Sequence, residues 1–373
     1  MVNSYEALFS GKKNQDKKKT TESKSAVGAE AVEQTQDKKV SELNKATNIK
    51  KEIAEITQGK NLEDLALEDL QKVLLKYKEM GNALGLSESE PKGDVKEQME
   101  NAKEIMGSDF FAHQEIEKAF GIKVKSEQIP EIPFTKEDLE RAKELNQFLI
   151  LRVDKANDGK PLTMAKMNEL LKGKVKDGKK ALYSDDGTGK FKDDSWYKDE
   201  DFATKESPKI SWALTSKEVI PNSSSKNYLD QTEEVVDYLK NQVFPAKGGS
   251  ALGGKGTEMP KIYKEAIEEF EKAKAEIKKL IDDDWQKAAE KLEGLAITKF
   301  TRQTPAEALY DILVYFQNKG ERLMENMYTW TSRRDSDGRL VAVGRFDSGG
   351  VHVDSGGPGY SSGYLGVSFS RSL

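Results

Sequence analysis

Apolar residues recur at helical spacing between residues 41 and 121, which predicts a helical region. Its best-marked helix ends near Gly81 and has an apolar face made of Leu62, Leu65, Leu67, Leu70, Val73, Leu74 and Tyr77. Weaker patterns predict helices over residues 94–106 and 110–120, the second stopped by Gly121. Residues 10–40 contain no aromatic residue, leucine or isoleucine. Since such a segment cannot bury enough apolar surface to offset its ordering entropy, we expect a disordered, lysine-rich N-terminus over residues 1–40.

Helical patterns continue through the middle of the chain, with one strand among them. Thr135 and Asp138 form a variant of the capping box, and the helix that follows has an apolar stripe made of Leu139, Ala142, Leu145, Phe148 and Leu149. The sequence ISWALTSKEVIP predicts a strand that ends at Pro221. Further helices are predicted over residues 226–243, over the strongly charged stretch 260–292, and from the N-cap Thr304 to about residue 324.

Near residue 328 the period of the apolar residues changes from 3.6 to 2. Apolar residues alternate with small or polar ones over residues 328–330, 340–346, 351–354 and 365–369, and turns rich in glycine and serine separate these segments. In the third segment the two valines face one side, while His352 and Asp354 face the other. The alternation favours a sheet over the alternative, a disordered Gly/Ser tail. We expect Val341, Val343, Phe346, Val351, Val353, Leu365, Val367 and Phe369 to share the buried face of this sheet.

The composition changes sharply at the same place. The final lysine is Lys319 and the final glutamate is Glu325, although both residue types are frequent before them. Residues 331–373 also lack glutamine, asparagine, methionine and tryptophan, and they contain nine glycines and nine serines. The composition of this segment is therefore under a different constraint from that of the scaffold that precedes it.

Whole-chain composition limits the possible functions. The chain has 373 residues, a net charge of −5 and 34% charged residues, so no global basic field favours nucleic acid as a partner. The lack of cysteine excludes disulfides and thiolate metal sites, and His113 and His352 are the only histidines. We therefore expect no metal, no cofactor and no enzymatic activity. No apolar stretch reaches the roughly 18–20 residues of a membrane span, and no secretory signal is apparent at the N-terminus, so a cytoplasmic location is expected, with surface or virion display left open.

Three motifs suggest chemistry but have better explanations. The sequence DSGGP at residues 354–358 reproduces the surroundings of a chymotrypsin-like nucleophile, but His113 lies in a predicted helix and His352 is only three residues from Ser355. Residues 249–257 nearly spell a phosphate-binding loop, but they carry an extra glycine and follow a helix instead of a strand. Residues 154–165 begin like a calcium loop but end on Ala165, where a bidentate glutamate is needed.

The C-terminal segment carries a longer pattern, RxSDGxLVxVGxFxSxGVxVxxxxPxxSxxxLGVSFSR, which begins at Arg334 and follows Trp330. This pattern resembles the variable region of target proteins that are diversified by retroelements. The resemblance is strongest over residues 328–373, extends less distinctly back to about Ile132, and does not cover the first 130 residues. It implies a C-type-lectin-like fold with hypervariable residues near the carboxyl terminus.

The genetic code gives a further test of this resemblance. Such retroelements change template adenines, so an AAC or AAT codon can become any codon that ends in C or T. These codons never encode Lys, Glu, Gln, Met or Trp, which are among the residue types missing from residues 331–373. The resemblance implies that the ligand-binding, variable positions are Ala342, Arg345, Asp347, His352, Asp354, Ser355, Gly356, Gly357, Gly359, Tyr360, Ser362, Gly363 and Tyr364.

The sequence thus predicts an α+β protein in three parts. A disordered N-terminus (1–40) and a helical region (41–131) precede a C-type-lectin-like domain with a helical insertion (132–373), whose variable region is 331–373. The expected function is non-enzymatic binding of a variant-specific ligand, which we take to be a protein. Two alternatives stay open: a structural or adhesive component such as a virion or surface fibre, and an enzyme related to formylglycine-generating enzymes.

Overall fold

A computed structural model describes residues 94–245 and 258–372, together with five separate positions between residues 51 and 76. Contacts divide the chain into two units, Met1–Pro91 and Lys92–Leu373. The predicted disordered segment 1–40, almost all of the predicted helix over residues 62–77 and most of the loop 244–257 lie outside the described residues. Residue 131, the predicted end of the helical region, lies inside the second unit. Strand β1 (Phe110–Phe111), which precedes it, pairs with strand β2 (Gln147–Arg152), which follows it.

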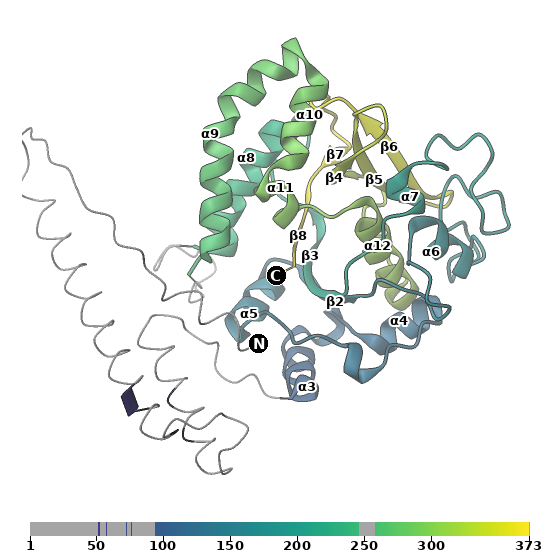
Figure 1. The fold of residues 1–373 in the computed structure, drawn as a ribbon. Helices are drawn as coiled ribbons and strands as arrows, with labels where there is room; N and C mark the ends of the chain where they lie inside the picture. Colours follow the sequence, from purple (N-terminus) through teal and green to yellow (C-terminus); the bar gives the residue numbers. More distant parts are fainter. Residues whose placement is uncertain are drawn as a thin grey trace, which may run out of the picture. The chain divides into compact units, whose positions relative to one another are not determined.

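The second unit is an α+β fold in which helices surround two sheets (Figure 1). Its α-helices are α3 (Val95–Met106), α4 (His113–Phe120), α5 (Lys136–Glu144), α6 (Met164–Leu170), α7 (Asp201–Thr204), α8 (Tyr228–Tyr238), α9 (Lys261–Asp283), α10 (Trp285–Gly294), α11 (Ala296–Thr301) and α12 (Pro305–Lys319). Short 3₁₀ turns at Gly107–Asp109 and Ser126–Gln128 and a π-helical turn at Leu239–Val243 complete the helical elements. The predicted helix over residues 226–243 thus corresponds to α8 and the π-helical turn.

Each sheet has four strands. The first has the order β1-β2-β3-β8, with β3 (Ser211–Val219) antiparallel to both β2 and β8 (Ser368–Ser372). The second has the order β6-β5-β4-β7, formed by β4 (Tyr328–Arg334), β5 (Leu340–Asp347), β6 (Gly350–Gly356) and the short β7 (Leu365–Gly366). Only Val367 separates β7 from β8, so the chain passes from one sheet to the other at this residue.

Helix α12 lies between the two sheets and contacts β2, β4 and β5. Thr304 is the predicted N-cap and also forms a capping box with Glu307, and Gly320 ends the helix in a left-handed conformation. Nearly all its residues are buried, and the ring of Phe316 packs edge-on against Phe346 at 5.0 Å. The helix therefore fills the core between the sheets.

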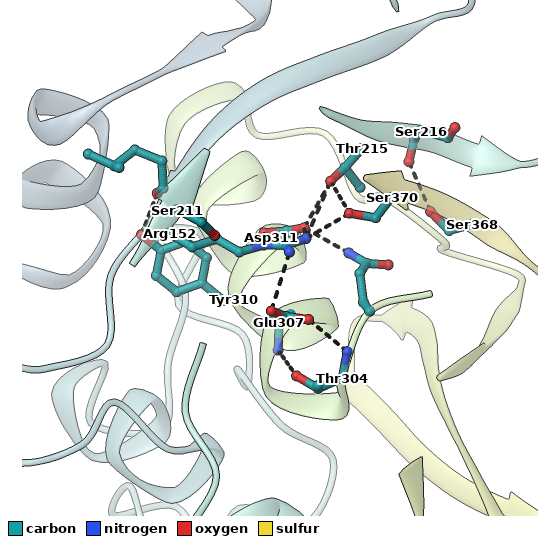
Figure 2. Close-up of polar contacts among 12 residues, drawn as sticks. Arg152, Ser211, Thr215, Ser216, Thr304, Glu307, Tyr310, Asp311, Ser368 and Ser370 are labelled. Atoms are coloured by element: carbon teal, nitrogen blue, oxygen red, sulfur yellow. Dashed lines mark hydrogen bonds and ion pairs between the residues drawn. The ribbon is translucent and has the colours of Figure 1, made fainter. Parts of the chain in front are cut away.

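A buried polar network joins α12 to the first sheet (Figure 2). The guanidinium of Arg152 on β2 bonds both carboxylate oxygens of Asp311 and also the hydroxyls of Thr215 and Ser370 on β3 and β8. Burial alone would lower the pKa of Arg152, but the carboxylates of Asp311 and Glu307 raise it overall. Burial raises the pKa of Asp311, and Arg152 opposes that rise. Residues from three strands and one helix thus satisfy one another in the interior.

Several predicted elements differ from the structure at their ends. Phe148 lies in β2 and not in the helix that follows Thr135, because α5 ends at Glu144 and Asn146 turns the chain with a positive φ of 55°. The charged helix predicted over residues 260–292 is two helices, since Asp284 ends α9 and its carboxylate caps α10. The helix predicted to run to about residue 324 ends at Lys319, and Phe110 and Phe111 form a strand ahead of α4.

The predicted single buried face of the C-terminal sheet is wrong. Val341, Val343, Phe346, Val351 and Val353 pack in a core with α12. Leu365, Val367 and Phe369 belong instead to a second core, formed with α8, α9, α10 and α11. Leu365 is in β7 of the second sheet, whereas Phe369 is in β8, after the chain has crossed into the first sheet. Phe369 is fully buried there, with its ring edge-on to Tyr238 at 5.3 Å.

Candidate binding site

A pocket of about 480 Å³ opens on the second sheet, on the face opposite the core that contains α12. It is lined by Asn326, Tyr328, Trp330, Ala342, Arg345, Asp354, Ser355, Tyr360, Ser362, Tyr364 and Leu365. Trp330, Ala342 and Asp354 are cross-strand neighbours on β4, β5 and β6. Because directly paired residues project to the same side of a sheet, these three side chains form one continuous floor.

The floor is backed by buried aromatic packing. Trp330 is only 2% exposed and packs against Tyr228 of α8 with ring centroids 5.9 Å apart. The hydroxyl of Tyr228 donates to the carbonyl of Thr331 at 2.9 Å, and the guanidinium of Arg302 lies 3.9 Å from the centre of its ring. Burial lowers the pKa of Arg302. The Trp330 part of the floor therefore belongs to the fixed core of the protein.

A bulge in β5 places Arg345 at the pocket. Arg345 has a φ of 45°, and its backbone N–H donates to the carbonyl of Met327 at 2.7 Å. The preceding Gly344 has a φ of 152°, and a Cβ atom there would lie 2.2 Å from the same carbonyl oxygen. Bulges re-aim side chains beside binding and active sites. The glycine at position 344 thus permits the close backbone approach to Met327, and the resulting bulge leaves the Arg345 side chain exposed.

The turn after β6 forms the outer wall of the pocket. Tyr360 and Tyr364 are 57% and 69% exposed. Backbone bonds fix the turn: the N–H of Tyr228 donates to Pro358, that of Ser225 to Ser362, and that of Tyr328 to Tyr364. The backbone is therefore anchored where the side chains are exposed.

Two titratable groups near the pocket are shifted by burial. Burial raises the pKa of Tyr328, and the side chain of Arg345 opposes the rise. Burial also lowers the pKa of His352. The carboxylate of Asp347, 3.6 Å away, opposes this lowering. His352 is therefore neutral near pH 7 and presents an uncharged aromatic ring.

The structure brings most of the predicted positions together. Seven of them line the pocket, namely Ala342, Arg345, Asp354, Ser355, Tyr360, Ser362 and Tyr364. Ala342 was expected to be exposed but is only 3% exposed, since it lies on the pocket floor under the wall.

The remaining predicted positions surround the pocket. His352 and Asp347 lie along β6 and at the end of β5. A Cβ on Gly356 would lie 3.2 Å from the Trp330 ring, one on Gly357 would lie 3.8 Å from Trp285, and one on Gly359 would lie 3.0 Å from Ile281. Gly363 follows Ser362 in the exposed wall.

Sequence reasoning missed Asn326, Tyr328, Trp330 and Leu365 as pocket residues. Tyr328 and Trp330 alternate in the sequence as expected for a strand, but nothing in that alternation distinguishes a pocket floor from a core face.

A scan against protein-family models, a search of curated proteins and a search of solved structures each found no match. Within the described ranges 94–245 and 258–372, no set of acidic or histidine side chains is grouped as a metal site would require. No helix in that part of the chain is both long and apolar enough to cross a membrane.

Proposed function

We propose that this protein binds a variant-specific protein ligand through a diversified surface centred on the pocket. In this proposal the described C-terminal unit has a C-type-lectin-like fold, and retroelement diversification generates the side chains at the pocket. The observation that carries the proposal is that seven positions expected to vary, spread over residues 342–364, converge on one pocket.

The pocket suits recognition for physical reasons. Its volume falls within the roughly 300–1,000 Å³ typical of ligand sites, and its wall presents exposed tyrosines, which are enriched in binding surfaces. The buried Trp330 in the floor and the backbone bonds of the wall separate folding from recognition. Side chains at the wall can then change with little effect on stability.

In this proposal the variable region contributes β5, β6 and β7 to the second sheet and β8 to the first. A genomic test addresses the diversification directly. An adenine-rich near-copy of codons 331–373 beside a reverse-transcriptase gene is expected, and its absence from the encoding genome would contradict retroelement diversification.

A binding test addresses the surface itself. The thirteen predicted positions are randomised in the full chain with codons ending in C or T, and the library is selected against hen egg-white lysozyme. A matched library randomises thirteen exposed positions on α9 and α10. We expect folded lysozyme binders from the pocket library and few or none from the helical one. Pocket variants that are mostly unfolded, or equal yields from both libraries, would contradict the proposal.

A further inference from the structure

Large exposed apolar side chains are concentrated beside β6. Among the described residues, those with the greatest exposure are Tyr183, Trp196, Ile210, Ile262, Tyr360 and Tyr364. Tyr360 and Tyr364 line the pocket, whereas Tyr183 and Trp196 come from the long connection between α6 and β3. The structure nevertheless brings these last two against β6.

Tyr183 is held on β6 by backbone pairing. The N–H of Val351 donates to the carbonyl of Ala181 at 2.9 Å, and the N–H of Tyr183 donates to the carbonyl of Val351 at 3.0 Å. The Tyr183 ring stacks on His352, with centroids 4.2 Å apart and planes 22° apart, and yet remains 52% exposed. Lys192 places its ammonium 4.8 Å from the centre of the same ring.

Trp196 is held at the edge of β6, two residues along from Val351. Its indole nitrogen donates to the carbonyl of Val353 at 3.3 Å, which satisfies its only polar atom. Its ring packs edge-on against the buried Tyr197 and leaves 43% of the residue exposed. Both rings are thus fixed in orientation without being covered.

We propose that Tyr183 and Trp196, here called the aromatic ledge, form a second contact region for the protein ligand that the pocket binds. This inference rests on the proposed function and extends the recognition surface beyond residues 331–373. His352, under Tyr183, is two residues along β6 from Asp354 of the pocket, a distance of about 6.6 Å along a strand. A partner that covers the pocket therefore reaches Tyr183, the nearer residue of the ledge.

The ledge differs from the pocket in how its residues are specified. Trp196 is encoded by a codon that adenine substitution of AAC or AAT cannot produce, and in the sequence it lies far before the C-terminal segment. Rigid tyrosine and tryptophan rings contribute strongly to binding because little conformational freedom is lost when they are covered. The ledge supplies the same apolar contacts to every variant, whereas the pocket supplies the selective ones.

The test uses the lysozyme binders selected from the pocket library. Tyr183→Ser and Trp196→Ser are introduced separately into ten independent binders, with Ile210→Ser and Ile262→Ser as controls, since both isoleucines are 40% exposed and neither lines the pocket. We expect Tyr183→Ser to weaken lysozyme binding by about tenfold in at least half of the binders, and the control changes to alter Kd by less than about twofold.

The outcomes separate the two proposals. If Tyr183→Ser leaves lysozyme affinity unchanged in more than half of the binders, the ledge proposal is wrong. The proposed function of the pocket would still stand in that case. If Trp196→Ser unfolds the protein, the effect of Tyr183→Ser on lysozyme binding tests the ledge by itself. This change is less disruptive to the fold, because the Tyr183 side chain donates no hydrogen bond to β6. A pocket library that yields no lysozyme binder contradicts the proposed function, and the ledge proposal falls with it.

Discussion

Two regions of this protein use similar residue types in opposite ways. In the network between α12 and the first sheet, Arg152 is buried and is bonded to side chains from β3, β8 and α12. At the pocket on the second sheet, Arg345 is exposed and projects from a bulge. The first region joins segments that are far apart in sequence, whereas the second leaves Arg345 exposed to solvent. The same residue type can therefore stabilise the fold or remain available for recognition, according to its burial and partners.

The largest expected effect on stability comes from removing the buried charge of Arg152. Arg152→Met should lower the free energy of unfolding by about 3–5 kcal/mol, because it leaves the Asp311 carboxylate buried without its cation. Denaturant unfolding measures the loss. The double change Arg152→Met/Asp311→Asn should recover part of it, since the uncompensated charge is gone.

Arg345→Met is the matched control, and we expect it to change stability by less than about 0.5 kcal/mol. Equal losses from Arg152→Met and Arg345→Met would refute the distinction between the two regions.

The bulge that presents Arg345 gives the next effect in size. Gly344→Ala should lower stability by about 1–3 kcal/mol, because its Cβ would meet the Met327 carbonyl oxygen. Arg345→Gly should leave stability unchanged or slightly higher, because glycine adopts the positive φ of this position without strain. Thermal unfolding of both variants tests the pair. A destabilised Arg345→Gly together with a neutral Gly344→Ala would show that the bulge is not held as described.

Sequence periodicity predicted much of the fold, because local signals mark most of its elements. Thr304 was predicted to begin α12, and the structure confirms it as the N-cap, although the helix ends at Lys319 and not near residue 324. The strand over residues 211–219 and the alternation in β5 and β6 were likewise found. Local signals failed where tertiary pairing decides the structure. The run from Phe148 to Leu151 is apolar on both faces, so its pattern is equally consistent with a helix and with a buried strand.

The pocket could be predicted only in part for the same reason. The C-terminal positions came from the resemblance of residues 328–373 to a family of variable regions, which is carried by the sequence itself. The partners that complete the surface, such as Trp330 beneath it and Tyr183 beside it, depend on how strands pair. Arg152 was not identified as the centre of a buried network, because its partners lie up to 218 residues away in the chain.

A smaller effect is expected at the pocket wall. Replacing Tyr360 and Tyr364 together by serine should change the free energy of unfolding by less than about 0.5 kcal/mol per site, because both side chains are largely exposed. Phe369→Ala, in the same C-terminal segment, should cost about 3–5 kcal/mol, because its ring is fully buried. Denaturant unfolding of the two variants compares them. A large loss for the tyrosine variant would mean that the wall is part of the core.

The smallest expected effect concerns the charge of His352, which lies between the pocket and Tyr183. Its pKa is lowered from the ordinary value of 6.5, first by burial and then by Arg345, while the carboxylate of Asp347 raises it. Asp347→Asn should therefore lower this pKa further, and Arg345→Met should raise it. Because the chain has two histidines, an NMR titration of the imidazole protons reads His352 directly, with His113 as the internal control. Shifts of equal sign in the two variants would contradict the arrangement of charges around the ring.

The same pKa sets a pH dependence of stability. The folded-state pKa lies below the unfolded value, so the folded protein binds fewer protons than the unfolded chain between the two values. Stability from His352 is thus complete above the ordinary value of 6.5 and is lost as the pH falls through that value toward the folded-state pKa. His352→Gln should remove this part of the pH dependence, which unfolding measured on both sides of pH 6.5 would detect. If His352→Gln and the unmodified chain lose stability equally over this range, the ring is not held in the neutral form by its burial against Tyr183.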